Sequence, residues 1–243
     1  MLTIPTAKIM KNTSLISTII FSLSLCIAAV IVSVSIANIG KPTRSVYVKG
    51  LCEIEKPADH VIWPIAQVEM GNNLPLIYKK LNNKNNLIIQ FLKKGGINDN
   101  EISVNSIEVE DRNARTYTEA KSLFRYKVTQ VITVSSKNVD SVRKLIDKQN
   151  ELIINEINIS DDKWSYQIDY SFNDLELVKP MMIQMATKNA RATAQKFAED
   201  SDSKIGKIKT ASQGQLSINQ RDQYTPHIKK LRVVTSVEFF LED

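Results

Sequence analysis

The stretch ATKNARATAQKFAED, residues 186–200, has an alanine at every fourth position. At about 100° per residue, this spacing keeps small side chains on one side of a helix. That side comprises Met182, Ala186, Ala190 and Ala194, joined by Phe197. Polar side chains fall on the opposite side, at Lys188, Arg191, Gln195 and Glu199. The pattern predicts an amphipathic helix from residue 174 to about residue 200.

The small side chains indicate what this helix contacts. Because alanine is short, the helix backbone can approach a sheet or a second helix closely, with Met182 and Phe197 filling the space at either end. The charges on the opposite side exclude a helix pair within a membrane. We therefore expect Ala186, Ala190 and Ala194 to pack inside the chain, and a contact between subunits is the alternative.

The segments before this helix alternate between strand-like and helix-like patterns. Apolar residues recur at every second position in VYVKGLCEIE, residues 46–55, and HVIWPIAQVEM, residues 60–70, follows after a turn. These two segments predict a hairpin. The other predicted elements of this half are a helix from Pro75 to the glycines at 95–96, strands at 101–110 and 122–136, and a helix at about 139–149.

The second half repeats this order of elements. Its predicted elements are strands at 156–159 and 164–172, the alanine-rich helix, and strands within 204–218 and 231–241. An α+β fold follows, in which helices pack on largely antiparallel sheet. The sequence thus predicts two similar strand-strand-helix-strand-strand units, preceded by one N-terminal hydrophobic helix.

The N-terminus carries the largest excess of apolar residues. No charged residue occurs from Ser14 to Ile39, and Lys8 and Lys11 precede this run. A helix of this length reaches roughly 39 Å, which is enough to cross a hydrocarbon core of about 30 Å. The sequence therefore predicts a short cytoplasmic segment or signal n-region at 1–13, a transmembrane signal anchor at 14–39, and an exported domain at 40–243.

A cleaved secretory signal is the competing interpretation of this run. Ser35 and Ala37 offer small residues for cleavage after Ala37, although the run exceeds the usual signal core of about 7–15 residues. A lipoprotein signal at Cys26 fits less well, because Leu25 is bulky and the apolar run continues. We expect a single-pass inner-membrane protein with its C-terminal domain in the periplasm, and secretion to the periplasm after cleavage near Ala37 is the alternative.

The sequence lacks the residue groups of most familiar enzymes. It has two histidines, His60 and His227, and one thiol outside the apolar run, Cys52, so it offers no His/Cys metal cluster of ordinary spacing. It also lacks the motifs of phosphate-binding loops, serine hydrolases and zinc proteases. We therefore expect no catalytic residues, no metal and no cofactor, and we expect Cys52 to be a core residue.

The strongest polar candidate is the loop NQRDQYTPHIKK ahead of the last strand. Arg221, Asp222, Tyr224 and His227 gather there, where an acid/base or binding role would be compatible with a long polar loop. We favour a structural role, in which an Arg221–Asp222 pair steadies a turn ahead of the proline. The reason is that no second acid or nucleophile lies nearby in the sequence.

The net charge of +6 gives little support for a nucleic-acid partner. Lysines occur as pairs at 79–80, 93–94 and 229–230, and no aromatic residues interleave with them as a base-stacking surface requires. Weak attraction to an anionic membrane surface or cell-wall polymer is compatible with the positive surplus. We expect no nucleic-acid partner, and the sequence identifies no small-molecule ligand.

Four motifs, taken in order, resemble the SIMPL-domain family of bacterial envelope proteins over nearly all of residues 44–243. They are VKGLCEIEKPADH, GGINDNEIS, the alanine row leading into FAEDSDSKIGKI, and the closing VVTSVEFFL. The resemblance implies an exported α+β protein, in a family generally without assigned enzymatic activity. It further implies ring or barrel oligomers for some members and links to stress resistance or surface antigens for others. It supplies no catalytic or ligand-binding residues.

Two functions follow as expectations. The first is a non-enzymatic envelope protein, held by its N-terminal helix, whose exported domain self-associates into a ring or barrel and protects or organises the envelope. The second is a periplasmic small-ligand binding module or hydrolase that uses the 221–227 loop. Self-association favours the first, and a ligand whose stabilising effect depends on His227 favours the second.

Overall fold

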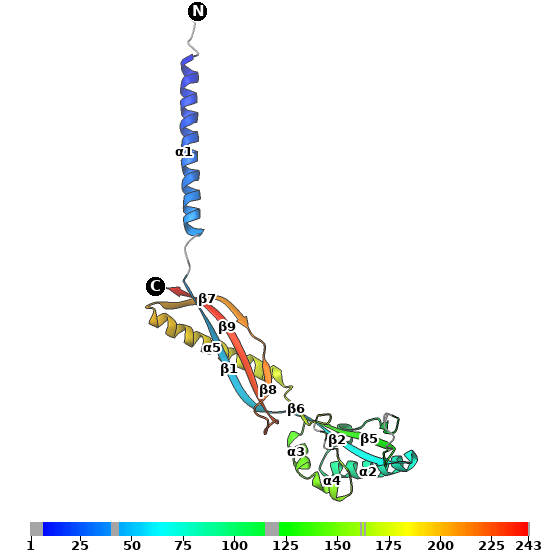
Figure 1. The fold of residues 1–243 in the computed structure, drawn as a ribbon. Coiled ribbons are helices and arrows are strands. Elements are labelled where there is room, and N and C mark those ends of the chain that lie inside the picture. The colour runs from blue at the N-terminus through cyan, green and yellow to red at the C-terminus, as the bar shows by residue number, and fades with distance from the viewer. Residues whose placement is uncertain (1–6, 40–43, 115–121, 161, 163, 243) are drawn as a thin grey trace, which may run out of the picture. The chain divides into compact units, whose positions relative to one another are not determined.

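Figure 1 shows the chain as a computed structural model, which describes residues 7–39, 44–114, 122–160, 162 and 164–242. The internal contacts divide the chain into two units. The first comprises Met1–Tyr47, Ala194–Lys209 and Glu238–Asp243, and the second comprises Val48–Thr193 and Thr210–Val237. The first six residues of the predicted segment 1–13, and residues 40–43 of the predicted domain, lie outside the described residues.

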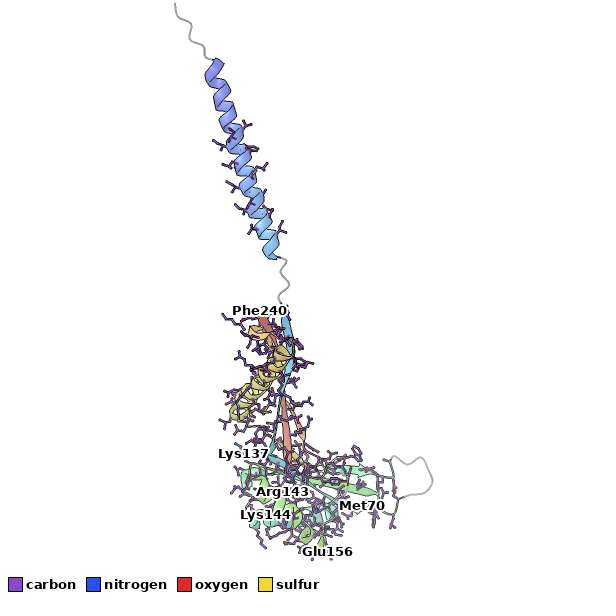
Figure 2. All side chains as sticks on the ribbon, turned by 90° about the vertical axis from the view of Figure 1, so that its left-hand side faces the viewer. Met70, Lys137, Arg143, Lys144, Glu156 and Phe240 are labelled. Atoms are coloured by element: carbon purple, nitrogen blue, oxygen red, sulfur yellow. The ribbon has the colours of Figure 1, made fainter. Side chains whose placement is uncertain are left out.

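Helix α1, Ala7–Ile39, covers the predicted apolar run. Its stretch Ser17–Ile36 has 20 residues and a mean hydropathy of 2.7, and none of that stretch is buried inside the protein. Figure 2 shows side chains projecting to both sides of this part of the helix. By length and composition, α1 can cross a membrane or serve as a signal sequence.

The first sheet has the strand order β1-β9-β7, with β8 also paired to β9. Its elements are β1, Ser45–Pro57; β7, Lys204–Gln213; β8, Ser217–Gln220; and β9, Ile228–Glu242; its helix is α5, Leu175–Asp200. Burial alternates along β9. The buried residues Leu231 and Val233 pack with Met182 and Ala186 of α5, so the helix covers that face of the sheet.

Helix α5 approaches this sheet through its alanines. A Cβ atom added to Gly50 on β1 would lie 1.9 Å from the carbonyl oxygen of Ala186 and 2.5 Å from the backbone nitrogen of Ala190. Both alanines are fully buried, and Met182 and Ala194 are buried on the same line. Small residues on strand and helix therefore set the distance between the two backbones.

Phe197 departs from the predicted packing. Its side chain is 56% exposed, whereas that of Ala198 is 1% exposed. The buried line follows every fourth residue from Met182 to Ala198, and Phe197 lies one position before that line. The prediction that Phe197 fills space beside the alanines is therefore wrong, because the buried side turns gradually around the helix and leaves Phe197 in solvent.

The second sheet has the strand order β3-β5-β2-β6, with β4 also paired to β5. Its strands are β2, His60–Gly71; β3, Ile102–Val104; β4, Glu108–Asp111; β5, Tyr126–Ser136; and β6, Asp169–Ser171. The helices beside it are α2, Leu74–Lys94; the short η1, Asp99–Glu101; α3, Val139–Asp147; and α4, Asn150–Ile154. The core between sheet and helices includes Ile65, Ile88, Leu92, Ile132 and Val142.

The hairpin predicted from 46–55 and 60–70 is wrong. β1 pairs with β9, whereas β2 pairs with β5 and β6, so the two segments belong to different sheets. β1 lies beneath α5 because Gly50 leaves room for the helix backbone, while Trp63 of β2 joins the larger apolar cluster that contains α2. The sheets therefore differ from the two predicted repeats, since β1 joins strands of the second half.

The strand predicted at 156–159 is also wrong. Helix α4 ends at Ile154, and Glu156 has a φ of 61°, in the left-handed region that interrupts an extended strand. Ile159 then forms an isolated bridge with Gln67 of β2.

The strand predicted at 164–172 shortens to β6. The Asp162 carboxylate accepts hydrogen bonds from the N–H groups of Trp164 and Ser165, both at 3.1 Å, and so holds the start of this segment in a turn. The predicted α+β class, the antiparallel sheets and the N-terminal apolar helix are confirmed.

Candidate functional site

The loop at 221–227 is a turn built around the carboxylate of Asp222. This carboxylate accepts hydrogen bonds from the N–H groups of Tyr224 and Thr225, both at 2.8 Å, and from Arg221 Nε at 3.0 Å. The Thr225 hydroxyl donates to it as well. The bonds from Thr225 and Arg221 hold the pKa of Asp222 well below its usual range, so the group is ionised at neutral pH.

Arg221 joins this turn to the first sheet. Its NH1 lies 3.5 Å from Glu55 Oε2 on β1, and its Nε also donates to Thr225 Oγ1 at 3.1 Å. The hydrogen bond with Asp222 raises the pKa of Arg221. Arg221, Asp222 and Thr225 are thus engaged with one another, and Arg221 also contacts β1.

His227 makes different contacts. Its ring lies edge-to-face against Tyr170 of β6, with 6.1 Å between the ring centroids. Burial lowers the pKa of His227, and the charges of Arg143 and Arg221 act in the same direction. Tyr224 is 84% exposed. Of the predicted loop residues, the structure therefore brings Arg221 and Asp222 together and places His227 against β6.

Asp59 organises the neighbouring segment, where the chain passes from β1 to β2. Its carboxylate accepts hydrogen bonds from the N–H groups of Asn173 and Asp174, each at 2.8 Å. The Ala58 N–H donates to the His227 carbonyl at 2.8 Å. A carboxylate in this position is favoured by the partial positive charge at the start of α5. These bonds join the β1–β2 link to α5 and to the 221–227 loop.

A cavity of about 350 Å³ opens beside these bonds, and we refer to it as the polar cavity. Its lining residues are Asp59, His60, Lys137, Asn173 and Asp174. His60 begins β2 and Lys137 directly follows β5. The antiparallel register pairs Val61 with Ser136, so His60 and Lys137 come to the same end of the sheet.

The charged side chains that line the polar cavity differ in whether they already have hydrogen-bond or ion-pair partners. The Asp59 carboxylate is occupied by backbone N–H groups. Among the described residues, Lys137 (Figure 2) and Asp174 have no ion-pair partner. His60 Nε2 lies 3.1 Å from Ser135 Oγ, within hydrogen-bond distance. Within the described part of the chain, the cavity therefore presents a cation and an anion without ion-pair partners, and an imidazole in contact with a hydroxyl.

A chain of buried amides lies elsewhere, between α2 and the second sheet. Gln67 Nε2 donates to Asn85, Asn85 Nδ2 donates to Gln130 Oε1 at 2.9 Å, and Gln130 Nε2 donates to the Asn105 carbonyl at 3.1 Å. Gln67 Oε1 has no hydrogen-bond partner in the described part of the chain. Enclosed amides of this kind fix how a helix sits on a sheet.

Metal binding has no cluster to support it within the residues that the structure describes. No group of three or more His, Cys, Asp or Glu side chains there is placed to hold an ion. Cys52 is buried in the cluster beneath α5, and burial raises the pKa of its thiol. A thiol in that state is a poor nucleophile.

Sequence patterns do not reveal the polar cavity. Its residues are single polar side chains at the ends of different elements, without a recurring spacing. Only the register between β2 and β5, and the position of the start of α5, bring them together. Of the residues predicted from the 221–227 loop, His227 accepts a hydrogen bond through its carbonyl from Ala58, the residue before Asp59.

A comparison with models of protein families places the chain in a family. A family model described as SIMPL, protein of unknown function (DUF541), matches residues 46–237. The match begins within β1 and ends within β9, so it includes both sheets and excludes α1. A comparison with curated proteins found no match.

Proposed function

The chain belongs to the SIMPL family, and on that premise we propose that it is a non-enzymatic cell-envelope protein whose exported domain self-associates into a ring or barrel. The family description assigns no activity. Helix α1 lies outside the matched residues and fits an envelope protein. The observation that supports self-association is an apolar side of α5.

Three apolar side chains follow α5 at every fourth residue, beside the line of alanines. Leu177 is 77% exposed, Met181 43% and Met185 45%, and we refer to these three residues as the α5 flank. The next residue on this line, Asn189, donates from Nδ2 to the Leu51 carbonyl of β1 at 2.8 Å. The α5 flank therefore continues toward β1, an outermost strand of its sheet. Aligned exposed apolar side chains are typical of a helix that packs on another surface.

A second copy of the chain is the partner that we propose for the α5 flank. Beside an outermost strand, a neighbouring copy can add to the same helix-on-sheet layer that α5 and β1 form within one chain. The flexible methionines adapt to an irregular partner surface. When such a contact joins two different surfaces head to tail, repeated copies close into a ring if the rotation between them permits.

The test replaces Leu177 and Met185 with lysine in the full chain, solubilised in detergent, and measures protein mass by light scattering. We expect the unaltered chain to form a discrete multimer, and the double variant to shift to smaller species, because lysine charges oppose burial. Gln195→Lys, at an exposed position of the same helix ten residues beyond Met185, is the control and should assemble normally. A monomeric unaltered chain, or a double variant that assembles fully, would refute the proposal.

We further propose that the protein resides in the inner membrane, held by α1, with its C-terminal domain in the periplasm. The length of the apolar stretch supports a retained anchor, and cleavage near Ala37 followed by secretion is the alternative. A role in envelope stress protection is proposed from the family resemblance. Lower survival of a deletion strain under oxidants or detergents would support that role.

The alternative expectation, a ligand-binding or hydrolytic site within residues 221–227, has less support. The carboxylate of Asp222 and the guanidinium of Arg221 are occupied by each other, by Thr225 and by Glu55. The Asp222→Asn variant separates the two roles, because loss of stability is expected from a structural role and loss of a bound ligand from a functional one.

A further inference from the structure

The polar cavity brings opposite charges to one small space. Lys137 supplies an ammonium group and Asp174 a carboxylate, and neither has an ion-pair partner among the described residues. Asp59 contributes a second negative charge, but backbone N–H groups occupy its oxygens. A purely anionic ligand would meet Asp174 and Asp59, and a purely cationic one would meet Lys137.

Two other hydrogen-bonding side chains, His60 and Asn173, line the polar cavity beside these charges. His60 is fixed by its contact with Ser135 Oγ at 3.1 Å. The amide nitrogen of Asn173 donates to Ser171 Oγ at 3.3 Å, and the amide oxygen of this lining residue is a hydrogen-bond acceptor. A cation, an anion and hydrogen-bonding groups around one cavity match a ligand with two charged ends and a polar middle.

The volume restricts the size of such a ligand. At about 350 Å³, the cavity is at the lower end of the range of roughly 300–1,000 Å³ in which small-molecule sites fall. We propose that the polar cavity binds a small zwitterion with free amino and carboxylate ends, such as a dipeptide. Lys137 holds the carboxylate end and Asp174 the amino end. This inference is independent of self-association, because the α5 flank contributes no residue to the cavity.

The probe is glycylglycine, titrated calorimetrically into the full chain in detergent and compared with its N-acetyl and C-terminal amide derivatives. Each derivative removes one terminal charge. We expect glycylglycine to bind and each derivative to bind about tenfold or more weakly, because each derivative loses one charge-assisted hydrogen bond. Absence of glycylglycine binding at millimolar concentrations would overturn the proposal.

Two variants identify which side chain recognises which end. Lys137→Met should remove the preference for glycylglycine over its amide and keep the preference over the N-acetyl derivative. Asp174→Asn should remove the preference over the N-acetyl derivative and keep the preference over the amide. Asparagine is as well suited as aspartate to the position before the first turn of a helix, so α5 should remain intact. Lys188→Met, an exposed position of α5, is the control and should bind as the unaltered chain does. Unchanged preferences in both variants would place any binding elsewhere and refute the assignment.

Discussion

Gly50 shows how a single residue sets the spacing of a layer. Its missing side chain accommodates the backbone of α5, since a Cβ atom there would lie 1.9 Å from the Ala186 carbonyl oxygen. The sequence predicts the alanine side of the contact from its four-residue spacing. It gives no indication of the glycine side, because a glycine in a strand has several possible reasons.

Gly50→Ala should therefore destabilise the protein strongly. The nearest atoms to the new methyl group are backbone atoms of α5, so the helix itself must shift. We expect the free energy of unfolding to fall by about 3 kcal/mol, at the upper end of the overpacking range. Thermal melting measures this loss of stability. Lys49→Ala, at an exposed position, is the control, and its free energy of unfolding should lie within about 0.5 kcal/mol of that of the unaltered chain. A variant as stable as the control would contradict the close contact.

The Asp222 turn predicts a specific pH dependence. Because the folded pKa is lowered, the stabilisation is present above the unfolded pKa of about 3.9 and is lost as the pH falls through the folded pKa. Asp222→Asn should therefore melt at a lower temperature than the unaltered chain at pH 7. The difference in melting temperature between the two proteins should narrow progressively below about pH 4. A gap of constant size across that range would show that the ionised carboxylate is not the cause.

At the scale of elements, local pattern predicts helices better than strand pairing. The predicted ends of α2 agree with the structure, because Pro75 lies in its first turn and a glycine follows its last residue. Both signals are local in the sequence. The partners of β1 and β2 depend instead on which helix each can accommodate, a property of residues far along the chain. The polar cavity depends on strand register in the same way.

We expect Asn189 to protect the edge of β1. Its side-chain amide donates to the Leu51 carbonyl, and β1 is an outermost strand, whose unpaired backbone groups are sites for pairing with other chains. Asn189→Ala should make the detergent-solubilised chain form insoluble aggregate faster, while lowering the free energy of unfolding by only about 1 kcal/mol. Turbidity at constant temperature provides the measurement, and Gln184→Ala is the matched control. Equal rates for the two variants would argue against edge protection.

At the scale of the whole molecule, α1 precedes the residues that the SIMPL family model matches. Its stretch Ser17–Ile36 lies outside residues 46–237. The apolar run is visible in the sequence because length and hydropathy alone define it. Whether that helix is retained depends on a peptidase, which no folding pattern encodes.

Fractionation of cells tests retention directly. We expect the protein to remain in membranes washed with alkaline carbonate, because the apolar stretch of α1 is long enough to span the bilayer. Sequencing of its N-terminus should find residues upstream of Ser17 still present. A soluble periplasmic protein that begins at Asn38 would instead establish cleavage after Ala37.

Retention of α1 in the membrane lowers the affinity that the α5 flank needs in order to hold copies together. Molecules held in a membrane diffuse in two dimensions and share one orientation, so neighbours meet at a far higher effective concentration than the same molecules free in a large volume. A contact of three modest apolar side chains, too weak to persist in dilute solution, can then hold copies together. Expression level and membrane area, rather than intrinsic affinity alone, would set how much assembly forms.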